Sequence, residues 1–505
     1  ASPLKVVEPV FTTKRITQSN PLASEQNRIT VSLRTSISLL SDSEGVIYIS
    51  NLVGMLVSSV DVVVQDVETG VSVIDVFCSS SASGVISWDV SQAELTMKVC
   101  AGKTFSHSTD YVFSFNVTNP KSSQDSPVVR IRASLSTATI SEVVMEKSHQ
   151  PLLGVTNGTD PLKVVVPTLT RKLLAQSNPV TGMLNTLTLS LKTNVDLAGS
   201  EQSGFMLSEM YGFTMDLTFQ ISVAKDGTGE PNLFCVASVS RFENTATYSS
   251  SELVFNLCSD SKLYAGTLYT ITWTSRNGLA AQSSPNVEID VWGTAKFQNT
   301  PIDKPGLDLM GVSNGSNPLL LIVPSFVKRT IAQSNFLAGK INMITATLMT
   351  NLDLSGFESR TRISICCLDS ASIAGSTALL DVSSEAGSFT RFCRENAMDS
   401  PDDAALWNDS NGQISFFVCP SLENKIQAFK EYVFHFNITN PGRARDSPVI
   451  SISAFGVFNI SEQEMQKPGI IYHGIQNGSD PLRVIVPEFT TGAIGQSNPF
   501  SGLDN

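Results

Sequence analysis

The sequence predicts an all-β protein made of three tandem antiparallel β-sandwich domains in a row. Three observations lead to this prediction: one segment recurs four times along the 505 residues, apolar residues alternate with polar ones, and helix signals are few. A chain of this length allows three or four domains. A repeat of ~160 residues can bury an independent core.

The recurring segment, called the joint segment below, divides the chain into repeats. It reads NGTDPLKVVVPTLTRKLLAQSNP from Asn157, and its relatives begin at Asn314, at Asn477 and, shortened, at Ser2. Pro-Leu dipeptides inside the copies lie 158, 157 and 163 residues apart. The QSN triplets keep the same intervals and begin at Gln18, Gln176, Gln333 and Gln496.

These intervals predict four parts of the chain. The predicted parts are a first repeat over 1–156, a second over 157–313, a third over 314–476, and a fourth copy of the joint strand over 477–505. We expect the last part to connect one subunit to the next.

The length of the joint region is constant although its sequence varies. From Lys147 to Gln176 there are 29 positions, and the same count separates Lys304 from Gln333 and Lys467 from Gln496. Surface linkers tolerate length changes cheaply. A fixed length therefore favours a paired backbone with set geometry, and recent duplication is the alternative.

Each repeat shows the period of two that a half-buried strand requires. Apolar Ile29, Val31 and Leu33 alternate with polar neighbours, and Leu187 to Leu191 do the same. About eight or nine such runs per repeat, broken by Gly, Asn and Ser-Pro, are typical of an antiparallel sandwich. The octapeptides at 140–147 and 460–467 are expected to form single helical turns.

Four copies of the joint strand face only three cores, so one end of the chain carries a surplus. An unpaired apolar strand is a template for another sheet edge. Such a strand can pair with the sheet of another subunit, which is called strand addition. A head-to-tail contact that does not close propagates into a filament. The alternative is that the sequence is a piece of a longer polyprotein. The residues predicted to form the inter-subunit strand are Leu4, Val6, Val7, Phe11, Leu482, Val484, Val486 and Phe489.

Six of the eight cysteines form one pair per repeat at matching places. The predicted disulfides join Cys78 to Cys100, Cys235 to Cys258, and Cys393 to Cys419. Such a pattern indicates an oxidising compartment. Zinc binding is disfavoured because no CxxC motif occurs, and buried free thiols are the other alternative. Cys366 and Cys367 are extra, and a bonded neighbour pair, free thiols and an inter-chain link all stay open.

Acceptor motifs for N-glycosylation recur by position. We expect covalent glycans and no other cofactor. The alternative for the joint set is that Asn-Gly is simply a tight-turn dipeptide. The predicted N-glycosylation sites are Asn116, Asn157, Asn314, Asn408, Asn437, Asn459 and Asn477.

Composition argues against several function classes. A net charge of −12 and a pI near 4.9 disfavour a nucleic-acid partner. No apolar run reaches the ~18–20 residues of a membrane span. The chain starts at Ala1 without a signal peptide, so we expect a processed or partial chain.

No motif predicts catalysis, so the chain is not expected to be an enzyme. The Gly-Lys-Thr at Gly102 lacks the preceding glycine of a phosphate loop, and no nucleophile elbow occurs. The acidic stretch from Asp399 to Ser410 could hold calcium, but a solvated acidic loop is favoured. No catalytic and no metal-binding residue is predicted.

The joint pattern NG[ST]xPLxVxVPxF…QSNP, with TNVDL or TNLDL at Thr193 and Thr350, resembles tandem repeats of secreted glycoproteins from algae and other protists. These include fresh-water glycosylated fibrils and mastigoneme-like flagellar hairs. The resemblance implies an Ig-like sandwich, N-glycans at Asn157, Asn314 and Asn477, and polymerisation. A three-domain viral capsid is a competitor, but such capsids usually have dissimilar domains.

Together these features predict a structural subunit of an extracellular glycosylated filament that polymerises head-to-tail. Its expected partners are copies of itself and other surface glycoproteins, and its expected location is secreted, on the cell surface or on the flagellar surface. The alternative is a cell-surface adhesin or carbohydrate-binding protein whose repeats form a stalk, and an enzyme ranks third.

Overall fold

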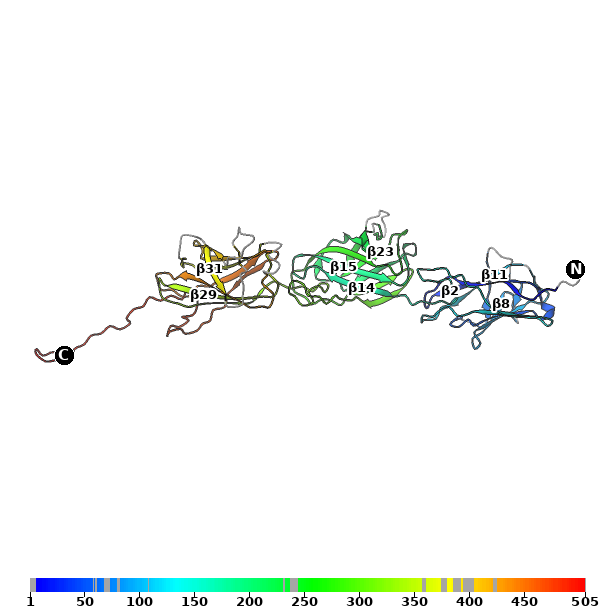
Figure 1. Cartoon of the computed structure of the whole chain (residues 1–505), viewed down its shortest axis with the longest axis horizontal. Helices are drawn as coiled ribbons and strands as arrows, with labels where there is room; N and C mark the ends of the chain where they lie inside the picture. The colour runs from blue at the N-terminus through cyan, green and yellow to red at the C-terminus, as the bar shows by residue number, and fades with distance from the viewer. Residues whose placement is uncertain are drawn as a thin grey trace.

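The computed structural model is a row of three β-sandwiches, with the N-terminus at one end and an extended C-terminal segment at the other (Figure 1). This arrangement confirms the predicted fold class. No helix among the described residues is long and apolar enough to cross a membrane. The structure describes residues 6–57, 59, 61–67, 73–79, 82–107, 109–229, 232–236, 244–356, 360–373, 379–384, 392–393, 404–420 and 425–504.

The strands of each repeat follow one another in chain order. The first repeat contains β1 (Phe11–Gln18), β2 (Gln26–Thr35), β3 (Leu39–Leu40), β4 (Val46–Ser50), β5 (Asp61–Val63), β6 (Gln65–Asp66), β7 (Phe77–Cys78), β8 (Val85–Asp89), β9 (Glu94–Val99), β10 (Thr104–Phe105), β11 (Tyr111–Thr118), β12 (Arg130–Ser134) and β13 (Thr139–Val144). The second contains β14 (Leu169–Gln176), β15 (Leu184–Thr193), β16 (Leu197–Ala198), β17 (Gly204–Ser208), β18 (Phe213–Thr214), β19 (Thr218–Gln220), β20 (Ser222–Lys225), β21 (Thr228–Gly229), β22 (Thr245–Ser249), β23 (Glu252–Asn256), β24 (Lys262–Leu263), β25 (Tyr269–Asn277), β26 (Glu288–Trp292) and β27 (Phe297–Pro301). The third contains β28 (Phe326–Gln333), β29 (Ile341–Thr350), β30 (Arg362–Cys366), β31 (Leu379–Ser384), β32 (Phe392–Cys393), β33 (Ala404–Asn408), β34 (Gln413–Val418), β35 (Tyr432–Thr439), β36 (Ser451–Phe455) and β37 (Ile460–Glu464). Two 3₁₀ turns, η1 (Ser41–Ser43) and η2 (Gly199–Glu201), are the described helical elements.

Each repeat packs two antiparallel layers. In the first repeat the layers have the orders β1-β2-β11-β6 and β13-β12-β4-β9-β8-β5. The second repeat has the equivalent orders β14-β15-β25-β20-β21 and β19-β22-β23-β17-β26-β27. In the third, β31 pairs with β35 on one side and with β33 on the other, so both layers join into one ten-stranded sheet. The first strand of every repeat therefore lies at a sheet edge.

The core follows from the alternation seen in the sequence. Strands β2, β15 and β29 share one burial pattern, in which every second residue is buried over ten residues. Ile29, Val31 and Leu33 are fully buried, as the period of two predicts. Three hydrophobic clusters result, with one in each repeat.

A phenylalanine before the first cysteine of each pair inserts into this core. Phe234 is fully buried and lies 5.8 Å from the ring of Phe205. The adjoining cysteine is thereby held at the rim of the core, facing its partner. The structure joins Cys78 to Cys100, Cys235 to Cys258, and Cys393 to Cys419.

The expected helical turns at 140–147 and 460–467 are wrong. The first stretch forms most of β13, which pairs with β12, and the second contains β37, which pairs with β36. Both are edge strands with a register shift. A bulge of this kind disturbs the period of two and makes a short strand resemble a helical turn.

We expect replacement of both Cys235 and Cys258 by serine to destabilise the second repeat by about 3 kcal/mol, because the disulfide limits the unfolded chain. In calorimetry the unfolding temperature of the second repeat should fall by roughly 6–12 °C. The exposed Ser259→Ala serves as the control. An unchanged unfolding temperature would show that this disulfide does not stabilise the repeat.

Candidate docking interface at the repeat junctions

The joint segment is shared between two repeats. Its first half, residues 157–165, packs on the first repeat, and its second half contains β14 of the second repeat. Leu162 is fully buried in the core of the first repeat. The boundary predicted at residue 157 therefore cuts through a segment that belongs to the preceding sandwich, because repeat spacing does not indicate on which neighbour a segment packs.

The backbone of the first half is paired on both sides. Val164 exchanges two hydrogen bonds of 2.9 Å with Gln124. The Val165 amide donates to the Pro21 carbonyl at 2.8 Å, and its carbonyl accepts from Ala23 at 3.0 Å. The predicted pairing of the joint backbone is confirmed. The equivalent pairs are Leu321 with Gln282, Ile322 with Pro179 and Thr181, Val484 with Arg445, and Ile485 with Phe336 and Ala338.

The lysine at the start of the constant region is also held. The ammonium of Lys147 donates to the Ser126 carbonyl at 3.1 Å, and Lys304 donates to the Ser284 carbonyl at the same distance. Burial lowers the pKa of Lys304. A partly buried cation that donates to a backbone carbonyl helps to set the direction in which the chain leaves the sandwich.

The buried side-chain amide of Gln18 holds the joint segment against the first repeat. The side-chain nitrogen of Gln18 donates to the carbonyls of Gly158 and Lys163, both at 2.8 Å. Its side-chain oxygen accepts from the Leu162 amide at 2.8 Å and from Asn27 at 2.9 Å. All four hydrogen-bonding positions of one amide are therefore used in a site where Gln18 is almost inaccessible.

Two buried asparagines extend this amide network. Asn27 donates to the side-chain oxygen of Asn119 at 2.9 Å and accepts from two backbone amides. Asn119 in turn donates to the carbonyls of Asn20 and Leu22. The same network recurs as Gln176–Asn185–Asn277 and Gln333–Asn342–Asn440.

The asparagine partners were not predicted from the sequence. The signal was present, because an asparagine follows each glutamine by nine positions, as in Gln18 and Asn27. Only the glutamines stood out, since they belong to the recurring QSN triplet.

Before each joint segment lies a short turn, the junction hairpin, which covers residues 152–155, 309–312 and 472–475. In the first junction the Leu153 carbonyl accepts from the Asp196 amide of the second repeat at 2.9 Å. Val155 and Leu22 are buried in the hydrophobic cluster of the second repeat. The hairpin therefore docks on the end face of the next sandwich.

Glycine is required at the tip of a docked hairpin. Gly154 has a φ of +73°, and a Cβ added there would lie 2.3 Å from Asp196 Oδ1 and 2.5 Å from the Ala265 Cβ. Gly311 meets Asp353 and Ala428 in the same way, at 2.3 and 2.7 Å. Contacts this short leave no room for a side chain.

The third hairpin has the same shape, but none of the sandwiches that the structure describes docks on it. Gly474 has a φ of +78°, and no described atom lies within 4 Å of an added Cβ. Ile475 and Leu337 are only half-buried, whereas their equivalents Val155 and Leu22 are buried. The end face of the third repeat therefore shows the docking geometry with its apolar residues only partly covered.

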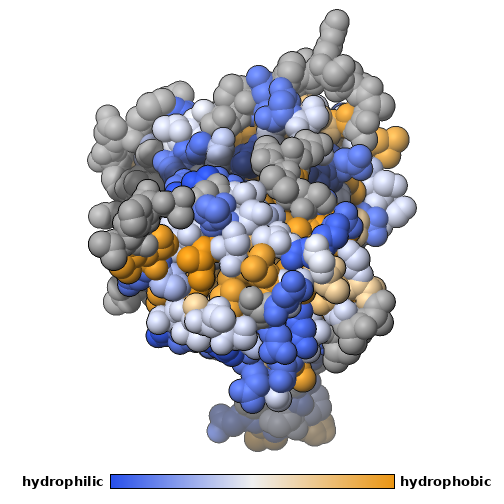
Figure 2. Space-filling model, turned by 90° about the vertical axis from the view of Figure 1, so that its right-hand side faces the viewer, coloured by the Kyte–Doolittle hydropathy of each residue, from blue (hydrophilic) through white to orange (hydrophobic). Residues whose placement is uncertain are grey.

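The opposite end face belongs to the first repeat. Figure 2 looks onto this end of the molecule and shows apolar side chains gathered between polar ones. Val10 and Ser36 exchange hydrogen bonds like those between Thr168 and Asn194 at the first junction. Val6 is 93% exposed, although its equivalent Val164 is buried.

Several residues predicted for the inter-subunit strand lie elsewhere. Phe11 is buried in the first core and Leu482 in the third, and Val484 is buried with its backbone paired to Arg445, so these three are not free to pair with another chain. The sequence suggested otherwise because an apolar strand at a chain end looks unpaired. Val7 and Val486 are about half exposed, and Leu4 lies outside the described residues.

The exposed part of the fourth joint segment includes Phe489. Residues 489–496, called the tail strand, repeat the sequence positions of β1 but form no described strand. Phe489 is 98% exposed and Ile494 is fully exposed, whereas the equivalent Phe11 and Ile16 are buried. The extended segment is visible at the C-terminal end in Figure 1.

All seven asparagines predicted to carry glycans are exposed. Glycosylation stays a prediction.

The acidic stretch at 399–410 lies partly outside the described residues. Cys366 and Cys367 are joined to each other.

Comparisons with known proteins add little to these observations. No protein-family model matches the chain, and no curated protein matches it. Among solved structures, the C-terminal domain of the Streptococcus agalactiae AgI/II polypeptide BspA is similar at 7% identity and a TM-score of 0.33, covering 59% of this chain and 98% of that one. A putative membrane anchored protein from Corynebacterium diphtheriae is 9% identical with a TM-score of 0.18, covering 90% and 88%. The collagen-binding domain of the Erysipelothrix rhusiopathiae surface protein RspB is 9% identical with a TM-score of 0.17, covering 58% and 91%. Likeness at this level carries no argument about function.

We expect Gln176→Ala to weaken the junction between the second and third repeats. The change leaves the Leu319 amide and the carbonyls of Gly315 and Leu320 without their partner, at a total cost of about 3 kcal/mol. Hydrogen exchange at the Leu319 amide should become faster, while Thr170→Ala on the same strand should leave it unchanged. Equal exchange in both variants would show that the amide does not hold the joint segment.

Gly311→Ala and Gly474→Ala form a matched pair. Both positions have a positive φ, so the conformational cost of alanine is similar, about 1 kcal/mol. Only Gly311 faces a neighbouring sandwich. Small-angle scattering should therefore show a wider range of angles between the second and third repeats for Gly311→Ala alone. The same scattering from both variants would contradict a docked hairpin.

Proposed function

We propose that the chain is a structural protein of the extracellular space, in which docked sandwiches form a stiff rod. The proposal rests on the junction: each joint segment is paired with one repeat and supplies the first strand of the next. Three disulfides favour an oxidising compartment. A rod of this kind suits a surface-protein stalk as well as a filament, and we assign no catalytic role.

The finer proposal is that copies join end to end. The exposed hairpin of the third repeat has the geometry that binds an end face at the two internal junctions. The first repeat of a second copy offers the corresponding face around Ser36 and Ser38, with Ser38 and His107 at the positions of Asp196 and Ala265. Continuity with an interface formed twice within the chain supports a second copy as the partner.

Docking in the same geometry brings two segments to one place. The tail strand of one copy and β1 of the next both carry the Phe, Ile and Gln that face the core and the amide network. Because β2 is the one described strand that β1 pairs with, replacing β1 leaves the other strand pairs in place, and the incoming strand has to remake the backbone bonds to β2 and Glu146. We therefore propose that the tail strand takes the edge position of β1, as in strand addition.

The tail strand differs from β1 at three positions, because Gly492, Ala493 and Gly495 stand in place of Lys14, Arg15 and Thr17. Lys14 pairs with Glu146 at 3.2 Å, and the contact lowers the pKa of Glu146. Gly492 stands at the equivalent position of the tail strand. The exchange therefore gives up the exposed ion pairs of Glu146 with Lys14 and Arg15, which are worth little, while the docked hairpin buries apolar residues. We also propose that the chain carries N-glycans and that it lies on a cell or flagellar surface.

A disulfide trap tests this proposal. Ala493 stands where Arg15 pairs with Ser32, so the variant Ala493→Cys with Ser32→Cys should form covalent oligomers between copies. Gly492→Cys with Ser32→Cys is the control, because its register is wrong by one residue and its side chain faces the other side of the sheet. Non-reducing gels and negative-stain images should show ladders and end-to-end rods for the first variant.

Adding Gly474→Ala to the trap variant should abolish the ladder while leaving each rod intact. Equal cross-linking in the matched and control variants would contradict the strand exchange. Single three-bead rods at all concentrations would leave the stalk as the supported function.

A further inference from the structure

The third repeat carries a pair of adjacent cysteines in place of polar residues. Cys366 ends β30, and Cys367 follows with a φ of 73°. The equivalent residues Asn51 and Glu209 have φ values of 63° and 61°. The bend is therefore a feature of every repeat, and the sulfur atoms are the feature specific to the third.

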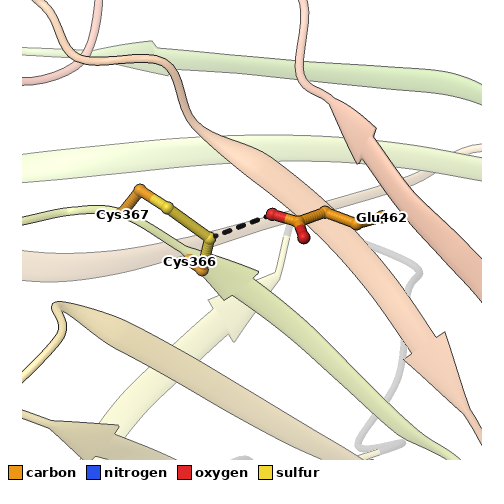
Figure 3. A group of neighbouring side chains, drawn as sticks. All are labelled: Cys366, Cys367 and Glu462. Atoms are coloured by element: carbon orange, nitrogen blue, oxygen red, sulfur yellow. Dashed lines mark hydrogen bonds between the residues drawn. A yellow bond between two sulfur atoms is a disulfide. The ribbon is translucent and has the colours of Figure 1, made fainter.

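A carboxylate lies beside these sulfur atoms. Figure 3 shows Glu462 reaching from β37 toward Cys366, with Oε1 3.5 Å from its Sγ. One ligand atom from each of Cys366, Cys367 and Glu462 lies within 4.8 Å of the other two. The Ser451 hydroxyl is 2.9 Å from the Cys366 Sγ and donates to Glu462.

The first repeat provides an internal comparison. There the equivalent carboxylate, Glu142, lies 3.6 Å from the Arg130 guanidinium and accepts from Ser50 at 3.3 Å. In the third repeat Ser451 replaces the arginine and Cys366 replaces the serine. The carboxylate has thus lost a fixed cation and gained two sulfur atoms.

We propose that Cys366, Cys367 and Glu462 form a binding site for a thiophilic divalent cation of the Zn²⁺ class, opened by reduction of the disulfide. The inference does not depend on end-to-end assembly. Thiolate sulfur and carboxylate oxygen are both ligands of Zn²⁺, and three protein ligands leave a fourth position for water. All three groups are at least partly exposed, so a cation can reach them.

The disulfide-bonded state and the cation-bound state of this site exclude each other chemically. A dithiol reductant transfers two electrons and two protons to the Cys366–Cys367 bond, which gives two thiols and the cyclic disulfide of the reductant. The cation then binds both sulfur atoms and the carboxylate, and two protons are released. In the oxidised state the sulfur atoms are bonded to each other and cannot act as thiolate ligands.

The test measures Zn²⁺ binding by the full chain. Wild type, Cys366→Ser with Cys367→Ser, Glu462→Gln and Glu142→Gln are titrated with Zn²⁺ after mild reduction and again without it. Thiols released from the other disulfides bind alike in every variant, so differences between variants isolate this site. Circular dichroism verifies that each variant is folded.

After reduction, wild type and Glu142→Gln should bind one more Zn²⁺ per chain than the double serine variant. Glu462→Gln should bind it at least about tenfold more weakly, since it lacks one ligand. The additional binding should be absent before reduction. The proposal is overturned if the double serine variant binds as much Zn²⁺ as wild type, if oxidised and reduced wild type bind equally, or if Glu462→Gln matches Glu142→Gln.

Discussion

The buried amide of Gln18, with its equivalents Gln176 and Gln333, is the interaction on which the architecture depends. Each amide closes the sandwich at the point where the chain leaves it, by satisfying two carbonyls and a backbone amide of the joint segment. If the segment detached, these groups and the amide itself would have to find other partners, at about 1–3 kcal/mol for each that stays buried. This constraint explains why the joint region keeps one length while its sequence changes.

A segment held in this way transmits geometry from one repeat to the next. Its first half is fixed to one sandwich, its second half is the edge strand of the following one, and the hairpin before it touches the same following sandwich. Three connections within about twenty residues limit hinge motion far more than a free linker would. A row of such junctions makes a rod, which is the property a stalk and a filament share.

The sequence was most informative where one periodic signal decided the structure. The alternation around Val31 identified a buried face, and the matched spacing of Cys235 and Cys258 identified a disulfide. The constant length of the joint region indicated its paired backbone. Each of these signals is local or repeats in register, so it can be read without knowing which segments meet in space.

The errors arose where a contact partner decided the outcome. The stretch at 460–467 resembles a helical turn in isolation and becomes a strand because β36 lies beside it. Leu482 looked like part of a free strand and is buried because the amide network folds it back. Glu462 lies 96 residues from Cys366 in sequence, so nothing in the sequence pattern joins them.

The central claim is that one docking geometry joins repeats within a chain and copies to one another. Spin labels at the equivalent, exposed positions Gln298 and Ser461 report the internal junction between the second and third repeats. In a mixture of chains labelled at Ser461 only and at Ser141 only, the same method reports the junction between copies. The expected result is one narrow distance distribution, equal in both samples. A narrow internal distribution with no distance between copies would contradict a shared geometry, and a broad internal one would contradict the rod itself.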